Sequence, residues 1–278
     1  MRLWAKEGPG MASAFPAGFA RPRSVDPSRV FGVGLVSLLL LVIGAPGLSH
    51  AHTILEPELV QGILLDITRF RKESREGTME EMRLEALYEL GEKVQGLVEL
   101  MNKDIGSHGF SDLFARLIVR RLHEYGIQVS FVERTKQYAY DFAAFREYLD
   151  RSPTGKRAAD VRYRLIADAF YRTLSMDTPG MFQGDVERLV AAVVEEEGFL
   201  KDFPDDRRAK EVHLFRATDY YRLFKNTRDP VKARRYEDLA LEALEGVVAQ
   251  YRGSPEARTA EGLLERLREG KENLHRAR

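Results

Sequence analysis

The stretch from Phe203 to Leu274 constrains the fold most, because it reads as three amphipathic helical patterns in succession. Two boundaries inside it carry a helix start signal, Asp229-Pro230 and Ser254-Pro255. In each pair a side-chain oxygen can accept from the free N–H groups of the first turn, and proline suits the first helical position. The sequence therefore predicts helices from Pro230 and from Pro255, and an all-α fold.

The bulk composition describes a chain that can bury a sizeable core. It has 278 residues, of which 44% are hydrophobic and 31% charged. Lys plus Arg and Asp plus Glu both number 43, so no net basic field favours a nucleic-acid partner. The chain has no cysteine, which excludes disulfides, a catalytic thiol and thiolate metal sites. We expect neither a cofactor nor a metal.

An apolar segment near the start has the length and flanks of an export signal. Residues 31–43 are apolar, arginines precede them, and a break rich in Gly and Pro follows. We expect cleavage after Ala51, which leaves His52 at the new N-terminus and the protein periplasmic or secreted. Two alternatives stay open: an uncleaved inner-membrane anchor, and a start codon assigned too far upstream. Membrane contact is expected only through this segment.

The rest of the chain alternates helical patterns with polar breaks. Residues 102–110 read as a loop by composition. Residues 126–136 change period, since Ile127, Val129 and Phe131 alternate with other residues. A single strand is not stable alone, so we favour an extended linker there. The remaining periodic segments predict helices at about 57–72, 78–101, 113–125, 138–150, 155–174 and 185–202.

The second half of the chain also repeats itself. Sliding it by about 50 residues superposes an aromatic residue, a short turn and an Ala-spaced helix on the next copy. Chance similarity between amphipathic helices is the alternative. A slide of 51 places Ala158, Val161, Asp168 and Phe170 on Ala209, Val212, Asp219 and Tyr221, and a slide of 48 places Phe203, Asp206 and Ala209 on Tyr251, Ser254 and Ala257.

Two segments carry a family resemblance: RATDYYRLFKNTRDP (216–230) and YEDLALEALEGVVAQYRGSPEARTAEGLL (236–264). They resemble tetratricopeptide repeats of the bacterial envelope, especially outer-membrane assembly lipoproteins of the BamD type. The resemblance covers roughly residues 138–275. It implies antiparallel helix pairs stacked as a solenoid, and an envelope scaffold that binds a protein or peptide. Two departures are a spacing of about 50 instead of 34 residues and the absence of the lipid-bearing cysteine.

The resemblance also implies a domain division and a binding face. We expect a signal peptide at 1–51, a helical region at 52–136 and tetratricopeptide-like repeats at 137–278. In tetratricopeptide proteins the first helix of each pair lines the concave face. Projected onto this chain, the partner-binding set contains Arg162, Tyr163, His213, Arg216, Tyr220 and Arg222. The partner's identity and the oligomeric state stay open.

Signs of catalysis are few. No GxSxG, Walker-type or GxGxxG motif occurs in a suitable context, so we do not expect an enzyme. The run Glu195 to Glu197 is interpreted as a solvated helix face. The alternative function is a periplasmic enzyme or small-ligand-binding protein with a site in the N-terminal half around His108, the one histidine in a predicted Gly-flanked loop.

Overall fold

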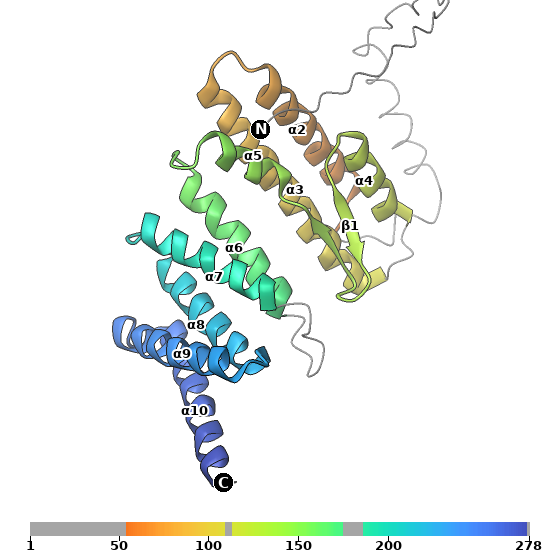
Figure 1. Cartoon of the computed structure of the whole chain (residues 1–278). Coiled ribbons are helices and arrows are strands. Elements are labelled where there is room, and N and C mark those ends of the chain that lie inside the picture. Colours follow the sequence, from red (N-terminus) through yellow and green to blue (C-terminus); the bar gives the residue numbers. More distant parts are fainter. Residues whose placement is uncertain (1–53, 109–112, 175–185, 277–278) are drawn as a thin grey trace, which may run out of the picture. The chain divides into compact units, whose positions relative to one another are not determined.

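The computed structural model describes residues 54–108, 113–174 and 186–276 (Figure 1). This part of the chain is predominantly helical, with 78% helix in nine helices and few strands. The predicted all-α class is confirmed at that level. The signal segment and the cleavage site at Ala51 and His52 lie outside the described residues.

The elements follow one another in a simple order. Three helices precede a β-hairpin, and six follow it. The helices are α2 (Pro57–Glu76), α3 (Glu80–His108), α4 (Leu113–Glu124), α5 (Ala143–Arg151), α6 (Ala158–Leu174), α7 (Val186–Asp202), α8 (Ala209–Asn226), α9 (Pro230–Gln250) and α10 (Pro255–Arg276), and the strands are β1 (Val129–Val132) and β2 (Gln137–Tyr140).

Both predicted helix starts in the C-terminal part are confirmed. The Asp229 carboxylate accepts from the N–H groups of Val231 (2.9 Å) and Lys232 (3.3 Å) at the start of α9. The Ser254 hydroxyl accepts from the N–H of Ala257 at 3.1 Å at the start of α10. These bonds satisfy N–H groups that have no partner within the helix.

The predicted loop at 102–110 is wrong over most of its length, because α3 continues to His108. Met101 is fully buried just before the expected break. Helix α3 also packs against β2 there. Packing of this kind outweighs the weak preference of Asn and Gly for turns.

The linker predicted at 126–136 and the helix predicted from Tyr138 are also wrong. Strands β1 and β2 pair antiparallel, with Val129 opposite Tyr140 and Phe131 opposite Tyr138. The Phe131 and Tyr138 rings meet edge to face with centroids 5.2 Å apart, the kind of cross-strand pair that stabilises a hairpin. The domain boundary predicted at 136/137 falls in the turn of this hairpin.

The 51-residue repeat is also a repeat of backbone structure at two turns. Before α6, the N–H of Gly155 donates to Ser152 O (3.2 Å) and that of Ala158 to Gly155 O (2.9 Å). Before α8, the equivalent bonds run from Asp206 to Phe203 (3.2 Å) and from Ala209 to Asp206 (2.8 Å). Ser152 therefore ends α5 and does not cap α6, which begins three residues later than predicted.

Helices α6 to α10 pack as successive neighbours, and α6 and α10 each also contact α8 (Figure 1). Small residues permit this close approach, since Ala217 of α8 and Ala260 of α10 are fully buried in one cluster. Between α6 and α8, the rings of Phe170 and Phe215 stack with centroids 4.1 Å apart. In the N-terminal part α3 packs against α2, α5 and β2.

No helix within the described ranges combines the length and the apolar character that crossing a membrane requires.

Candidate partner-binding site

Two ion pairs hold α3 beside α6 in a constant register. Arg157, directly before α6, pairs with Glu85 at 2.6 Å, and Arg164 of α6 pairs with Glu92 at 2.8 Å. Each pair joins residues 72 apart in the chain, and the two pairs are seven residues apart on both helices. The two helices therefore run in the same direction, and we call these two ion pairs the ladder.

Asp160 is the centre of a second connection between these helices. Its carboxylate accepts from the Tyr88 hydroxyl of α3 at 2.9 Å, from Arg164 Nε at 2.7 Å and from Arg208, which precedes α8. Burial opposes ionisation of Asp160, but the hydrogen bonds from Arg164 and Tyr88 outweigh it and lower its pKa. Burial and the bond to Asp160 raise the pKa of Tyr88 to about 12.

The same combination of groups recurs at the next junction. Arg157 lies over the Tyr88 ring at 4.5 Å, and Arg208 lies over the Tyr163 ring at 5.1 Å. The Tyr163 hydroxyl donates to Glu211 of α8, as that of Tyr88 donates to a carboxylate of α6. An arginine, a tyrosine and a carboxylate thus join α3 to α6, and the same three groups join α6 to α8.

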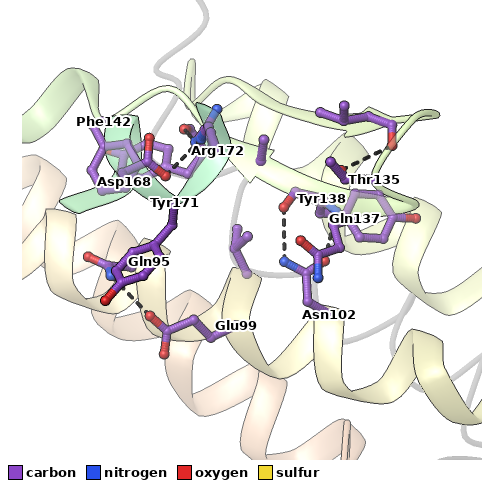
Figure 2. Close-up of a pocket in the computed structure, with 14 residues that line it drawn as sticks. Gln95, Glu99, Asn102, Thr135, Gln137, Tyr138, Phe142, Asp168, Tyr171 and Arg172 are labelled. Carbon is purple, nitrogen blue, oxygen red and sulfur yellow. Dashed lines mark hydrogen bonds and ion pairs between the residues drawn. The ribbon is translucent and has the colours of Figure 1, made fainter. Parts of the chain in front are cut away.

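Beyond the ladder, α3 and α6 enclose a cleft with the hairpin as its third wall (Figure 2). Its volume is about 320 Å³. The wall residues come from three segments that are far apart in the sequence. They are Gln95, Val98, Glu99 and Asn102 of α3, Val132, Thr135 and Gln137 to Tyr140 of the hairpin, Phe142, and Asp168, Tyr171 and Arg172 of α6.

Side chains occupy the outward edge of β2 in this cleft. Asn102 Nδ2 donates to Tyr138 O at 2.9 Å, and Tyr138 N–H donates to Asn102 Oδ1 at 2.7 Å (Figure 2). Two residues further along β2, Arg172 Nη2 donates to Tyr140 O at 2.8 Å. The hairpin wall is therefore fastened to both α3 and α6.

The α6 wall combines an ion pair with an open aromatic ring. Arg172 Nε lies 2.8 Å from Asp168 Oδ1. Burial raises the pKa of Asp168 even though Arg172 opposes the shift. Tyr171 is 56% exposed, which is unusual for a large ring on a packed helix. At the end of β2, Phe142 adopts a left-handed φ of 58° and is held by ring contacts with Tyr140 and Phe145.

A second hollow, of about 580 Å³, lies against the surface of α9. Its walls come from that one helix, from Pro230 to Glu242, and Val231 among them is 77% exposed. A site built from a single helix face has no opposing wall to orient a ligand. The cleft between α3, α6 and the hairpin is the better candidate.

Arg162 and Tyr163, predicted for the binding face, are held by residues of the fold. Arg162 Nη1 lies 2.5 Å from an Asp202 carboxylate oxygen at the end of α7, and its guanidinium lies 5.7 Å from the Phe203 ring centroid. The Tyr163 hydroxyl donates to Glu211. Both side chains are only partly exposed.

His213 and Arg216 lie together on α8. Arg216 Nη2 is 3.5 Å from His213 Nδ1, and the His213 and Tyr251 ring centroids are 5.9 Å apart. Burial, with the charge of Arg216 adding to it, lowers the pKa of His213. At neutral pH this histidine is therefore uncharged.

Tyr220 and Arg222 are buried, with 8% and 4% exposure. Tyr220 donates to Glu197 at 2.6 Å, and Arg222 donates to Asp219 at 2.8 Å and to Thr173 at 3.0 Å. Of the six predicted residues, the structure thus joins His213 to Arg216, while residues outside the set hold the other four. A binding role for the six stays a prediction.

The interpretation of Glu195 to Glu197 as a solvated face is wrong for its middle member. Glu196 is fully buried, and both its carboxylate oxygens lack a hydrogen-bond partner in the described part of the chain. It lies on the same stripe of α7 as Val193 and Leu200, which are also buried. Burial, and next the charge of Asp219, raise its pKa well above the usual range for glutamate.

His108 is the last residue of α3, and its side chain lies outside the described part of the structure. The site expected around it is therefore not described. Within the described ranges, no group of three or more His, Asp or Glu side chains could hold a metal ion.

No family model matches this sequence, and no curated protein matches it.

Sequence reasoning missed the cleft, although a signal for it was present. Glu85, Glu92 and Glu99 recur every seven residues along α3. Such a stripe predicts a charged contact with another helix. It does not identify α6 as the partner, because that helix lies 72 residues further along the chain.

Proposed function

We propose that this protein is an exported scaffold of the bacterial envelope, built from tetratricopeptide-like helix pairs, that binds a segment of a protein partner. The binding site is the cleft between α3, α6 and the hairpin. Its position between consecutive first helices corresponds to the face that tetratricopeptide proteins use for partners.

The observation that carries the proposal is the construction of the cleft. Three distant segments form its walls, and Asn102 and Arg172 fasten the hairpin wall to both helices. A volume of about 320 Å³ lies at the lower end of the range for ligand sites, which suits a few side chains of a bound segment. A rigid cleft lowers the entropic cost of binding.

Two further features support the scaffold part of the proposal. The hydrogen-bonded turns before α6 and α8 repeat at 51 residues. The junctions on both sides of α6 use the same arginine, tyrosine and carboxylate. The apolar segment at 31–43 supports export. Scaffolds take their function from the partner that they bind.

Site-specific photocrosslinking in producing cells tests this function. A photoreactive phenylalanine replaces Gln137 on the cleft wall, and Glu265, an exposed residue of α10, is the control position. We expect a discrete adduct from position 137 that is absent from position 265. Tyr171→Ala in the same chain should reduce its yield. Equal adducts from both positions, or an adduct unaffected by Tyr171→Ala, would contradict binding in this cleft.

The six residues predicted from the sequence, on α6 and α8, provide the competing surface. Arg216→Ala is tested for partner recovery from an envelope extract beside Tyr171→Ala. Loss of the partner with Tyr171→Ala alone supports the cleft. Loss of the partner with Arg216→Ala alone would show that the binding site lies at the six residues predicted from the sequence and not in the cleft.

A small-ligand function in the N-terminal half is the second candidate, and the cleft also favours it. The cleft has the volume of a small-ligand site, and burial raises the pKa of Asp168 in its wall. Mass spectrometry of protein purified from its native envelope distinguishes the two. A stoichiometric small molecule, released on unfolding and absent from Tyr171→Ala protein, would favour this candidate.

A further inference from the structure

The ladder between α3 and α6 has a third position that lacks a cation. One step of seven residues beyond Glu92 on α3 is Glu99, and one step beyond Arg164 on α6 is Tyr171. These two residues are again 72 apart, the spacing of both ion pairs in the ladder. Tyr171 thus occupies the position on α6 at which the seven-residue spacing of the ladder would place a third arginine. Glu99 and Tyr171 both line the cleft.

Glu99 and Tyr171 both line the cleft and both have groups available to a ligand (Figure 2). Within the described part of the chain, Glu99 accepts a hydrogen bond from Gln95 Nε2 at 3.0 Å. The Tyr171 ring packs edge to face against Phe170 and Phe215, with centroids 5.5 and 5.7 Å away. That packing holds the ring in place while 56% of the residue stays exposed.

We propose that this position binds a basic side chain, arginine or lysine, from the partner's segment; the inference rests on the proposed function. The cation lies against the Tyr171 ring and pairs with Glu99, as arginine pairs with glutamate in the ladder. The fold uses the same recognition internally, since Arg157 both pairs with Glu85 and lies over the Tyr88 ring. Arginine suits the position better than lysine, because its flat guanidinium can stack and form two bonds.

The structure also restricts how the rest of the segment lies. Tyr138 and Tyr140 direct main-chain groups away from β1, and Asn102 and Arg172 already bond to them. The segment therefore does not extend the hairpin as a third strand. The exposed side chain of Gln137 lines the same wall of the cleft. Its amide can form hydrogen bonds with the main chain of an extended segment.

Oriented peptide libraries test the inference on the full chain. Four pools of random nine-residue peptides carry Arg, Lys, Gln or Glu at the central position, and capture by the immobilised protein is measured at low and high salt. We expect the Arg pool to exceed the Gln pool roughly tenfold at low salt, from an ion pair combined with a cation–ring contact. The excess should shrink at high salt because the charges are then screened.

Three variants locate the effect. Glu99→Gln should bring the Arg and Gln pools to within about twofold of each other, while Glu265→Gln, the exposed control on α10, should preserve the wild-type ratio. Tyr171→Arg completes the ladder with an internal cation, so the preference for basic peptides should disappear while the fold stays intact by circular dichroism. An unchanged preference in both Glu99→Gln and Tyr171→Arg would overturn the inference.

The remaining outcomes separate this inference from the function on which it rests. If peptides crosslink to position 137 without any preference for Arg or Lys, the inference that the cleft binds a basic side chain is wrong. The proposed scaffold function is then unaffected. Failure of all four pools to crosslink at position 137 counts against the function itself. If N-ethylguanidinium binds as tightly as the Arg pool, the inference that the ligand is a peptide segment is wrong, because a small cation alone then accounts for the binding.

Discussion

At the residue scale, Glu196 of α7 carries a large electrostatic cost. Its carboxylate is fully buried with no hydrogen-bond partner in the described part of the chain. Asp219 opposes its ionisation, while Arg216 and Arg222 favour it. Burial dominates, so Glu196 stays protonated to a higher pH in the folded protein than in the unfolded chain.

Glu196→Gln should become more stable relative to the wild type as pH rises. The folded pKa lies above the unfolded value of about 4.3, so the wild type loses stability between those two pKa values. The gap should grow by about 1.4 kcal/mol per pH unit in that window and then level off. Urea unfolding from pH 4 to pH 8 measures it. The exposed neighbour variant Glu195→Gln is the control, and parallel profiles for Glu196→Gln and wild type would refute the prediction.

Two glycines of α3 provide a second prediction at this scale. A Cβ at Gly91 would overlap the Phe145 ring of α5, whereas one at Gly96 would meet no atom within 4 Å. Gly91→Ala should therefore destabilise the protein by about 1–3 kcal/mol. Gly96→Ala should stabilise it by about 0.4–1 kcal/mol through the unfolded state. Urea unfolding compares the two, and an equal effect of both would show that α3 and α5 are not in close contact at Gly91.

At the element scale, Asn102 joins the hairpin to α3. Its amide satisfies both main-chain groups of Tyr138, as a neighbouring strand would. Asn102→Ala should cost about 1–3 kcal/mol, because Tyr138 is buried and its main-chain groups lose their partners. The amide hydrogen of Tyr138 should also exchange faster. Gln137→Ala, on an exposed side chain of the same strand, is the control; unchanged exchange at Tyr138 in Asn102→Ala would exclude the connection.

Local signals in the sequence predicted the start of a helix correctly where a capping side chain marks it. Asp229 and Ser254 cap their helices as predicted, because a cap depends on groups within three residues. The end of α3 and the hairpin were missed, because both depend on packing between α3 and β2. Tyr138 and Tyr140 are two residues apart, which is a strand spacing, but they directly precede the helical spacing of Phe142, Phe145 and Tyr148. The pattern was therefore extended too far towards the N-terminus.

An ion pair also joins α8 to the start of α10. Glu256, at the start of α10, stands 48 residues after Arg208 and is paired with Lys210 at 3.2 Å. Arg208, directly before α8, pairs in the opposite sense with the acidic residue Asp160 of α6. Both ion pairs join the start of one helix to an earlier helix, with the positions of the two charges exchanged. A search for identical residues does not find this similarity.

At the scale of the whole molecule, the export signal is the prediction with the clearest outcome. N-terminal sequencing of exported protein should begin at His52, because residues 31–43 have the length of a signal core and small residues precede the cleavage point. A mature protein that starts near Met1 or Met11 would show that the segment is kept. The protein would then be anchored in the inner membrane, where its repeats could still bind a partner.

The cleft was not predicted from the sequence, and a binding role for the residues predicted instead stays a prediction. The six residues chosen from the family resemblance lie on α6 and α8, and four of them are held by residues outside the set. The resemblance implies which helices would come first in each pair. It does not identify which of their side chains the next pair covers, because that depends on how close neighbouring pairs approach.

The sequence alone determined the helical class and the two capped helix starts, because each depends on neighbours along the chain. Only the tertiary structure decided that Glu196 is buried, that residues 129–140 form a hairpin and that a cleft opens beside Glu99 and Tyr171. Each of these depends on segments brought together from far along the chain. Amphipathic spacing in the sequence predicts that a helix packs against another element. Only the structure identifies that element, as the ion pairs between residues 72 apart do for α3 and α6.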